Sequence, residues 1–138
     1  MSNIKKYYWI KLKTDFFDLP TIDWLMEQEN GCEYVLLYQK LCLMAANNGG
    51  TLIRQVGDLQ IPYDAKKIAV ITNFRLDIVI AAMDLYKKIG LVCEQDGGVL
   101  FLPYVPEIVG SESESAARVR KHRDIKEKNR KTEESDLP

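Results

Sequence analysis

Two apolar runs joined by a glycine-rich turn occupy residues 91–103, as LVCEQ (91–95), DGG (96–98) and VLFLP (99–103). Apolar runs on either side of a short turn that contains glycine predict an antiparallel β-hairpin. The hairpin follows directly on a helical pattern over residues 77–89, which Gly90 ends. This junction decides the fold, because few small folds run a helix straight into such a hairpin.

Further helices and two strands are predicted upstream of the hairpin. Residues 22–27 form a short helix capped by Thr21 or a residue near it, and residues 33–47 form the most apolar helix. Asp64 caps a helix over residues 65–71, and Asp77 caps the helix before the hairpin. Alternation predicts strands at residues 7–13 and 51–53. The fold class is therefore α+β and mainly helical: a winged helix-turn-helix with a C-terminal β-hairpin wing and an added N-terminal strand and helix.

The predicted core is drawn from the apolar faces of these elements. Cys42 and Cys93 lie in apolar patterns and are expected to be buried as small hydrophobic residues, without a disulfide. Ser111 to Ser115 are expected to form a polar linker or a helix start. Eight side chains are expected to be largely buried: Trp24, Leu37, Tyr38, Leu41, Ile68, Val79, Met83 and Leu91.

Charge is distributed unevenly along a chain of 138 residues whose net charge is only −1. Residues 116–131 carry eight Lys or Arg side chains against Asp124 and Glu127, and Val119 and Ile125 are their only large apolar residues. Such a segment cannot form its own core. We expect a winged-helix domain over residues 1–110, followed by a basic tail over 111–138 that is disordered or conditionally helical. A polyanion is the expected partner of this tail.

The sequence contains no arrangement of residues for catalysis, a cofactor or a metal ion. The single histidine, His122, lies in the tail, so neither a Ser-His-Asp set nor a His-rich metal site can form within one chain. Neither phosphate-binding glycine motif, G-x-x-x-x-G-K-[ST] or G-x-G-x-x-G, occurs. We expect a protein that is not an enzyme. No apolar stretch is long enough to cross a bilayer and no signal peptide follows Met1, so a cytoplasmic location is expected.

The second helix of the predicted helix-turn-helix would read DNA at its N-terminal end. Asn73 there is suited to adenine, and Arg75 to guanine or a phosphate. The alternative is that Thr72 and Asn73 only form the turn while Arg75 is a solvated charge. Exposed Ile80 and Ala81 would contact thymine methyl groups or a protein partner. The predicted DNA-binding residues are Lys66, Lys67, Thr72, Asn73, Arg75, Arg118, Arg120, Lys121, Arg123, Lys126, Lys128, Arg130 and Lys131.

The ordered set of short motifs resembles the phage replisome organizer N-terminal region family. The motifs are YWIKL (8–12), DFFD (15–18), YxxLYxKL (34–41), NNxGxL (47–52), IPYD (61–64) and GSESxSAxRVR (110–120). The resemblance implies a DNA-binding protein of phages or prophages of Gram-positive bacteria. It would bind the replication origin in double-stranded DNA, often as a homo-oligomer. Members usually continue into a C-terminal region that contacts a helicase or helicase loader. This chain ends at Pro138 as either a short or a truncated member, so that contact is expected of a region outside it.

Two further functions stay open at this point. A winged-helix transcriptional regulator that binds a promoter operator would share the same fold and the same candidate residues. A protein–protein module would use the apolar helix before the hairpin to face a partner and would bind no DNA. The residues alone do not separate these alternatives from replication initiation.

Overall fold

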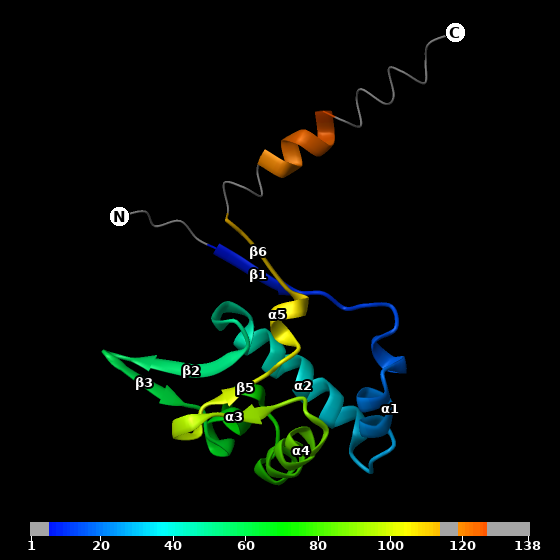
Figure 1. Cartoon of the computed structure of the whole chain (residues 1–138), viewed down its shortest axis with the longest axis vertical. Helices are drawn as coiled ribbons and strands as arrows, with labels where there is room; N and C mark the ends of the chain where they lie inside the picture. Colours follow the sequence, from blue (N-terminus) through cyan, green and yellow to red (C-terminus); the bar gives the residue numbers. More distant parts are fainter. Residues whose placement is uncertain (1–5, 114–118, 127–138) are drawn as a thin grey trace. The chain divides into compact units, whose positions relative to one another are not determined.

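The computed structural model describes residues 6–113 and 119–126, and the predictions that fall on other residues lie outside it. The chain divides into two compact units. The larger unit is Trp9–Val109, and the smaller one combines Met1–Tyr8 with Gly110–Pro138. The fold is α+β, with mainly helical elements and small antiparallel sheets (Figure 1).

Four α-helices form most of the larger unit. They are α1 (Pro20–Met26), α2 (Gly31–Ala45), α3 (Ala65–Thr72) and α4 (Leu76–Ile89). A one-turn helix, α5 (Val105–Ile108), follows the last strand of this unit. Short 3-10 turns occupy η1 (Phe16–Asp18), η2 (Ala46–Asn48) and η3 (Asp96–Gly98). All four predicted helices are therefore present, with bounds shifted by a few residues.

The core lies around α2, as its apolar pattern predicts. Leu37 and Leu41 on this helix are fully buried, and Tyr38 packs on Tyr86 of α4 with ring centroids 5.8 Å apart. Burial is confirmed for seven of the eight predicted core residues. Trp24 is the exception, since its side chain is 37% exposed on α1 while Ile22 and Leu25 are buried instead. Pro20 occupies the first position of this short helix, where its fixed φ suits the start of a helix.

The predicted C-terminal hairpin is confirmed as an antiparallel pair. Strands β4 (Cys93–Glu94) and β5 (Leu100–Phe101) pair in the register Cys93 with Phe101 and Glu94 with Leu100. Gly97 and Gly98 adopt positive φ angles of 77° and 78° in the turn, which explains the glycines of the DGG sequence. The strands are shorter than the apolar runs suggest, because Leu91, Val92 and Leu102 are buried beside the strands and not within them.

A second hairpin, longer than the first, was not predicted. Strand β2 (Thr51–Val56) extends beyond the predicted residues 51–53 and pairs with β3 (Leu59–Pro62). The two-residue turn between them contains Gly57 with a φ of 61°. The sheet order is β3-β2-β5-β4, so β2 joins the two hairpins, and Figure 1 shows β2 and β3 projecting from the helices. The far end of this hairpin is exposed, including its paired residues Val56 and Leu59, so no buried apolar stripe marks it in the sequence.

Gly50 fixes the junction between α2 and the sheet. Its φ is +99°, and a Cβ placed on it would lie 2.7 Å from the backbone oxygen of Leu102. Its carbonyl accepts a hydrogen bond of 2.8 Å from the Leu102 amide. No other residue allows this approach, so the end of the C-terminal hairpin is tied to the end of α2.

The smaller unit contains a two-stranded pairing and a basic helical segment. Strand β1 (Lys6–Ile10), which matches the predicted N-terminal strand, pairs with β6 (Val109–Ser113). The expectation of a linker or helix start at Ser111 is therefore wrong, because the backbone there is extended and hydrogen-bonded to β1. Residues 119–126 are helical. Residues 114–118 and 127–138 of the tail lie outside the described part of the chain.

Three smaller predictions are also corrected. Cys93 is exposed on the two-residue strand β4, while Cys42 is buried as expected. Asp77 lies inside the first turn of α4, since the helix already begins at Leu76 with Arg75 as its N-cap. Leu19, with no side-chain hydrogen bond, stands at the N-cap of α1 in place of Thr21.

Candidate nucleic-acid interface

Helices α3 and α4 are joined by a short turn, and the first of them is capped as predicted. The Asp64 carboxylate accepts a hydrogen bond of 2.8 Å from the Lys67 amide, which satisfies a free donor at the start of α3. Lys66 beside it is exposed, and Lys67 is half-buried. The first turn of α3 therefore presents one freely accessible cation, at Lys66, and a partly covered one at Lys67.

The turn between the two helices depends on Asn73. Its φ of 60° is left-handed, and it is the only non-glycine residue with a positive φ among the residues that the structure describes. Asparagine tolerates this conformation better than most residues. The following amide, of Phe74, donates to the Ala69 carbonyl at 3.2 Å and closes the end of α3. Asn73 therefore forms the turn, as one alternative held, and its side chain is also exposed to solvent.

Thr72 does not belong to this surface, and its prediction as a DNA contact is wrong for this structure. Only 3% of the residue is exposed, and its hydroxyl donates to the Ile68 carbonyl at 2.6 Å. A buried hydroxyl without a partner would destabilise the fold, so the bond back to the preceding turn of α3 satisfies it. Thr72 shapes the end of α3 from within.

Lys40 of α2 holds the same turn from beneath, and the sequence analysis missed this residue as part of the site. Its ammonium donates to the Thr72 carbonyl at 3.0 Å and lies 5.2 Å from the centroid of the Phe74 ring. A cation at the C-terminal end of a helix is favoured by the helix dipole, and the aromatic face adds to the attraction. A single lysine in a helix as apolar as α2 was the available signal.

Charged groups along α4 are paired with one another. Arg75 lies 3.3 Å from Asp77, and both side chains are more than 70% exposed. Lys88 lies 2.9 Å from Asp84 one turn back, and Lys87 lies 3.4 Å from Glu94 on the hairpin. Exposed pairs of this kind contribute only about 0–1 kcal/mol. A phosphate can therefore replace any of these three carboxylates at little cost. Arg75 thus remains able to bind an anion.

The helical segment 119–126 brings the basic charge of the smaller unit. Arg120, Lys121, Arg123 and Lys126 are all exposed there. The Arg120 guanidinium lies 3.2 Å from a carboxylate oxygen of Glu112, whose side chain is only 15% exposed. This pair joins the helical segment to β6. Arg118, Lys128, Arg130 and Lys131, which were also predicted to bind DNA, lie outside the described residues.

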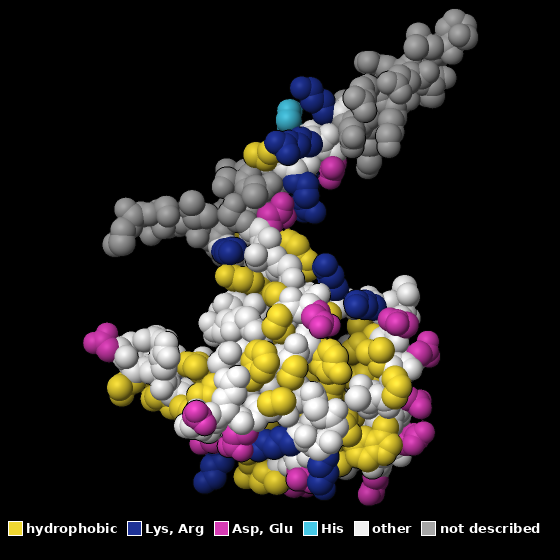
Figure 2. All heavy atoms as spheres, viewed as in Figure 1, with side chains coloured by type: hydrophobic (Ala, Val, Ile, Leu, Met, Phe, Trp, Pro, Cys, Tyr) yellow, Lys and Arg dark blue, Asp and Glu magenta, His cyan; other side chains and the backbone are white. Residues whose placement is uncertain are grey.

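Acidic side chains gather around α1. Figure 2 shows acidic side chains along the edge of the larger unit that α1 and its flanking loops form. A duplex would be repelled there. This edge is therefore poorly suited to a polyanion. The exposed acids of this region are Asp15, Asp18, Asp23, Glu27, Glu29 and Glu33.

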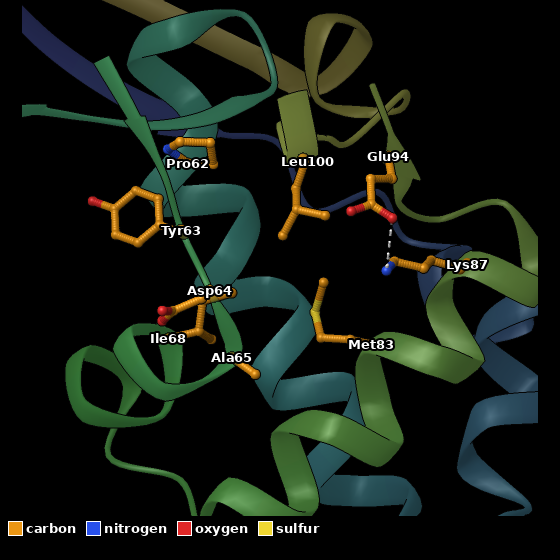
Figure 3. Close-up of a pocket in the computed structure, with 10 residues that line it drawn as sticks. Pro62, Tyr63, Asp64, Ala65, Ile68, Met83, Lys87, Glu94 and Leu100 are labelled. Carbon is orange, nitrogen blue, oxygen red and sulfur yellow. Dashed lines mark hydrogen bonds and ion pairs between the residues drawn. The ribbon is translucent and has the colours of Figure 1, made fainter. Parts of the chain in front are cut away.

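A pocket of about 400 Å³ lies between the start of α3, the end of α4 and the C-terminal hairpin (Figure 3). Ile68, Met83 and Leu100 give it an apolar lining. The Lys87–Glu94 pair crosses its side toward the hairpin, as the dashed line in Figure 3 marks. Its charged groups are thus already engaged with one another or, for Asp64, with the cap of α3. The pocket therefore lies where the hairpin faces helices α3 and α4.

The buried titratable groups lie under α4 and serve the core. Desolvation by burial raises the pKa of Cys42 to about 11 and raises the pKa values of Tyr38 and Tyr86 above their ordinary range. The Tyr86 hydroxyl donates a hydrogen bond to the Tyr34 carbonyl. Within residues 6–113 and 119–126, no group of three His, Cys, Asp or Glu side chains is placed to hold a metal ion.

The comparisons with known proteins agree with the ordered motifs of the sequence. No curated protein and no solved structure matches the chain. None of the helices in the described part of the chain is both long and apolar enough to span a membrane. A family model described as the N-terminal phage replisome organiser matches residues 9–131, which is most of the chain. The chain therefore belongs to the N-terminal phage replisome organiser family, whose members are phage proteins of DNA replication.

Proposed function

We propose that this chain is a DNA-binding replication initiation protein that binds a phage or prophage origin and helps to assemble the replisome. One observation carries the proposal: a helix-turn-helix in a member of this family presents Asn73 and Arg75, both exposed, where its second helix begins. Base-reading side chains in helix-turn-helix proteins stand at this position. Their amide and guanidinium groups match the edges of adenine and guanine.

The order and pairing of the elements support a winged helix. Helix α2 is followed by the hairpin β2–β3, then by α3 and α4, and then by the hairpin β4–β5, with β2 paired to β5. In this interpretation α4 enters the major groove and the hairpin is the wing. The wing tip carries Asp96, so we expect the wing to support α4 and not to hold a phosphate itself.

Phosphate contacts are assigned to Lys66 and Lys67 and to the basic residues that follow β6. Contacts to phosphates position a protein on the duplex without reading its sequence. Their number sets how strongly affinity falls with salt. The chain is expected to act by binding in the cytoplasm of the bacterial host, without catalysis or a cofactor. A second copy of the chain is an expected partner, and a helicase or its loader would be contacted by a region outside this chain.

Fluorescence anisotropy titrations against three labelled duplexes test the proposal. The duplexes are a repeat array from the protein's own coding region, its own promoter and a random sequence, all at one salt concentration. Replication initiation predicts the highest affinity for the repeat array. Preference for the promoter would instead indicate a transcriptional regulator of the same fold, and absence of binding to any duplex would refute DNA binding.

A further inference from the structure

The outer face of α4 is apolar where a DNA-reading helix is usually polar. Leu76 is 39% exposed and Ile80 is 54% exposed, and a spacing of four residues places them on one side of the helix. Ala81 beside them is partly exposed. The buried side of the same helix holds Val79, Ala82 and Met83, so the exposed residues are surplus to the core.

This face also carries little net charge. Asp77 is matched by Arg75 at 3.3 Å, and Asp84 is matched by Lys88 at 2.9 Å. The acids that would otherwise repel a duplex are therefore neutralised by neighbours on the same helix. A neutral, apolar face is poorly suited to phosphates, but it can approach the floor of a groove.

We propose that Leu76 and Ile80 read thymine, so that the preferred ligand is an A·T-rich duplex. This inference rests on the proposed function and specifies the ligand of the same site. Among the base edges of the major groove, only thymine presents an apolar group, its 5-methyl. The other edges offer hydrogen-bond donors and acceptors, which Leu76 and Ile80 cannot satisfy.

A protein partner would need a wide apolar surface. Stable interfaces bury about 800 Å² on each partner, and their centres are depleted of charge. Here two apolar side chains alternate with charged ones along a single helix, beginning one residue after Arg75. Continuity with Asn73 and Arg75, which are suited to base edges, favours a groove as the occupant.

The experiment uses the full chain and two synthetic duplexes, alternating poly(dA-dT) and alternating poly(dA-dU), which differ only in the thymine methyl groups. Affinities are measured by fluorescence anisotropy at one fixed salt concentration, because phosphate contacts contribute equally to both. The unaltered chain should bind the thymine duplex more tightly, by about fourfold for each methyl group in contact.

Two variants assign the preference to α4. The double variant L76A/I80A should bind the two duplexes equally, because it has no apolar side chain to meet the methyl groups. Leu43→Ala is the matched control, since Leu43 on α2 is 55% exposed, nearly the same fraction as Ile80. It should keep the preference of the unaltered chain. Circular dichroism should show the same helix content in all three proteins.

The outcomes separate this inference from the proposed function. Equal binding of both duplexes by the unaltered chain would overturn thymine reading, leave DNA binding intact, and turn attention to α4 as a protein-binding surface. A preference that persists in L76A/I80A would also overturn it. If neither duplex is bound, the proposed function fails and this inference fails with it.

Discussion

The turn between α3 and α4 and the basic helical segment 119–126 differ in what holds them in place. Buried contacts fix the turn: Thr72 is bonded back to Ile68, and Lys40 reaches the Thr72 carbonyl from the core helix. The basic segment has only exposed apolar residues, Val119 and Ile125, and one ion pair to β6. Reading a base requires a fixed side-chain position, whereas holding phosphates requires mainly charge. Under the proposed function, the turn is therefore suited to reading bases and the basic segment to holding phosphates.

Truncating an apolar side chain should give the largest difference in stability between the two regions. Leu41→Ala removes a fully buried side chain of α2 and should lower the free energy of unfolding by roughly 2–5 kcal/mol. Val119→Ala, at a position 50% exposed, should change it by less than about 0.5 kcal/mol. Urea unfolding followed by circular dichroism measures both. A loss under about 1 kcal/mol for Leu41→Ala would mean that α2 is not central to the core.

Removing the positive charges of the basic segment should lower DNA affinity and leave the stability of the folded domain unchanged. Removing residues 116–138 should weaken binding to every duplex, and log K should depend less steeply on log salt. Replacing Arg120, Lys121, Arg123 and Lys126 by Gln is the matched variant, with a slope reduced by up to about 4 and affinity lowered roughly tenfold to hundredfold at moderate salt. Thermal unfolding should be unaltered. An unchanged slope would reassign the tail to a linker or a protein-binding segment.

Substitutions in the turn should affect sequence recognition in preference to general affinity. Asn73→Ala or Arg75→Ala should weaken binding to the preferred duplex by roughly 1–3 kcal/mol and binding to random DNA by less. Anisotropy titrations on both duplexes measure the difference. Equal losses on the two would indicate a phosphate contact, and no loss on either would place the interface elsewhere. Asn73→Gly is a useful control, because glycine accepts the left-handed φ without the amide.

Substituting Lys40 should give the smallest change in stability and duplex affinity, because Lys40 acts only through the turn that it contacts. Lys40→Met removes the donor to the Thr72 carbonyl and should cost roughly 1 kcal/mol of stability, with a comparable loss of preferred-duplex affinity. Lys40→Arg should restore both, since a guanidinium can donate to the carbonyl and lie over Phe74. Affinity is measured well below the unfolding midpoint of each variant. Recovery of stability without recovery of affinity would show that Lys40 does not position the turn.

Local signals in the sequence account for the features that were predicted correctly. The apolar stripe of α2, the Asp64 cap, the glycine stop at Gly90 and the apolar runs around residues 96–98 are local signals, and each of these features is present. Local signals gave wrong predictions where the polarity of a side chain does not match its burial. Trp24 is large and apolar but partly exposed, and Thr72 is polar but buried. Cys93 lies in an apolar run but on an exposed strand.

By itself, the sequence determined the helices, the C-terminal hairpin, the uneven charge and, through its ordered motifs, the family. Each of these follows from neighbouring residues or from their order along the chain. The tertiary structure decided which of the candidate side chains are exposed and which are buried. In the fold, the buried Thr72 hydroxyl bonds to the Ile68 carbonyl, and Lys40 contacts a turn 32 residues away in the sequence. Strand β1 pairs with β6, although the two strands are about 100 residues apart. Such contacts depend on distant segments packing together, and no local pattern records them.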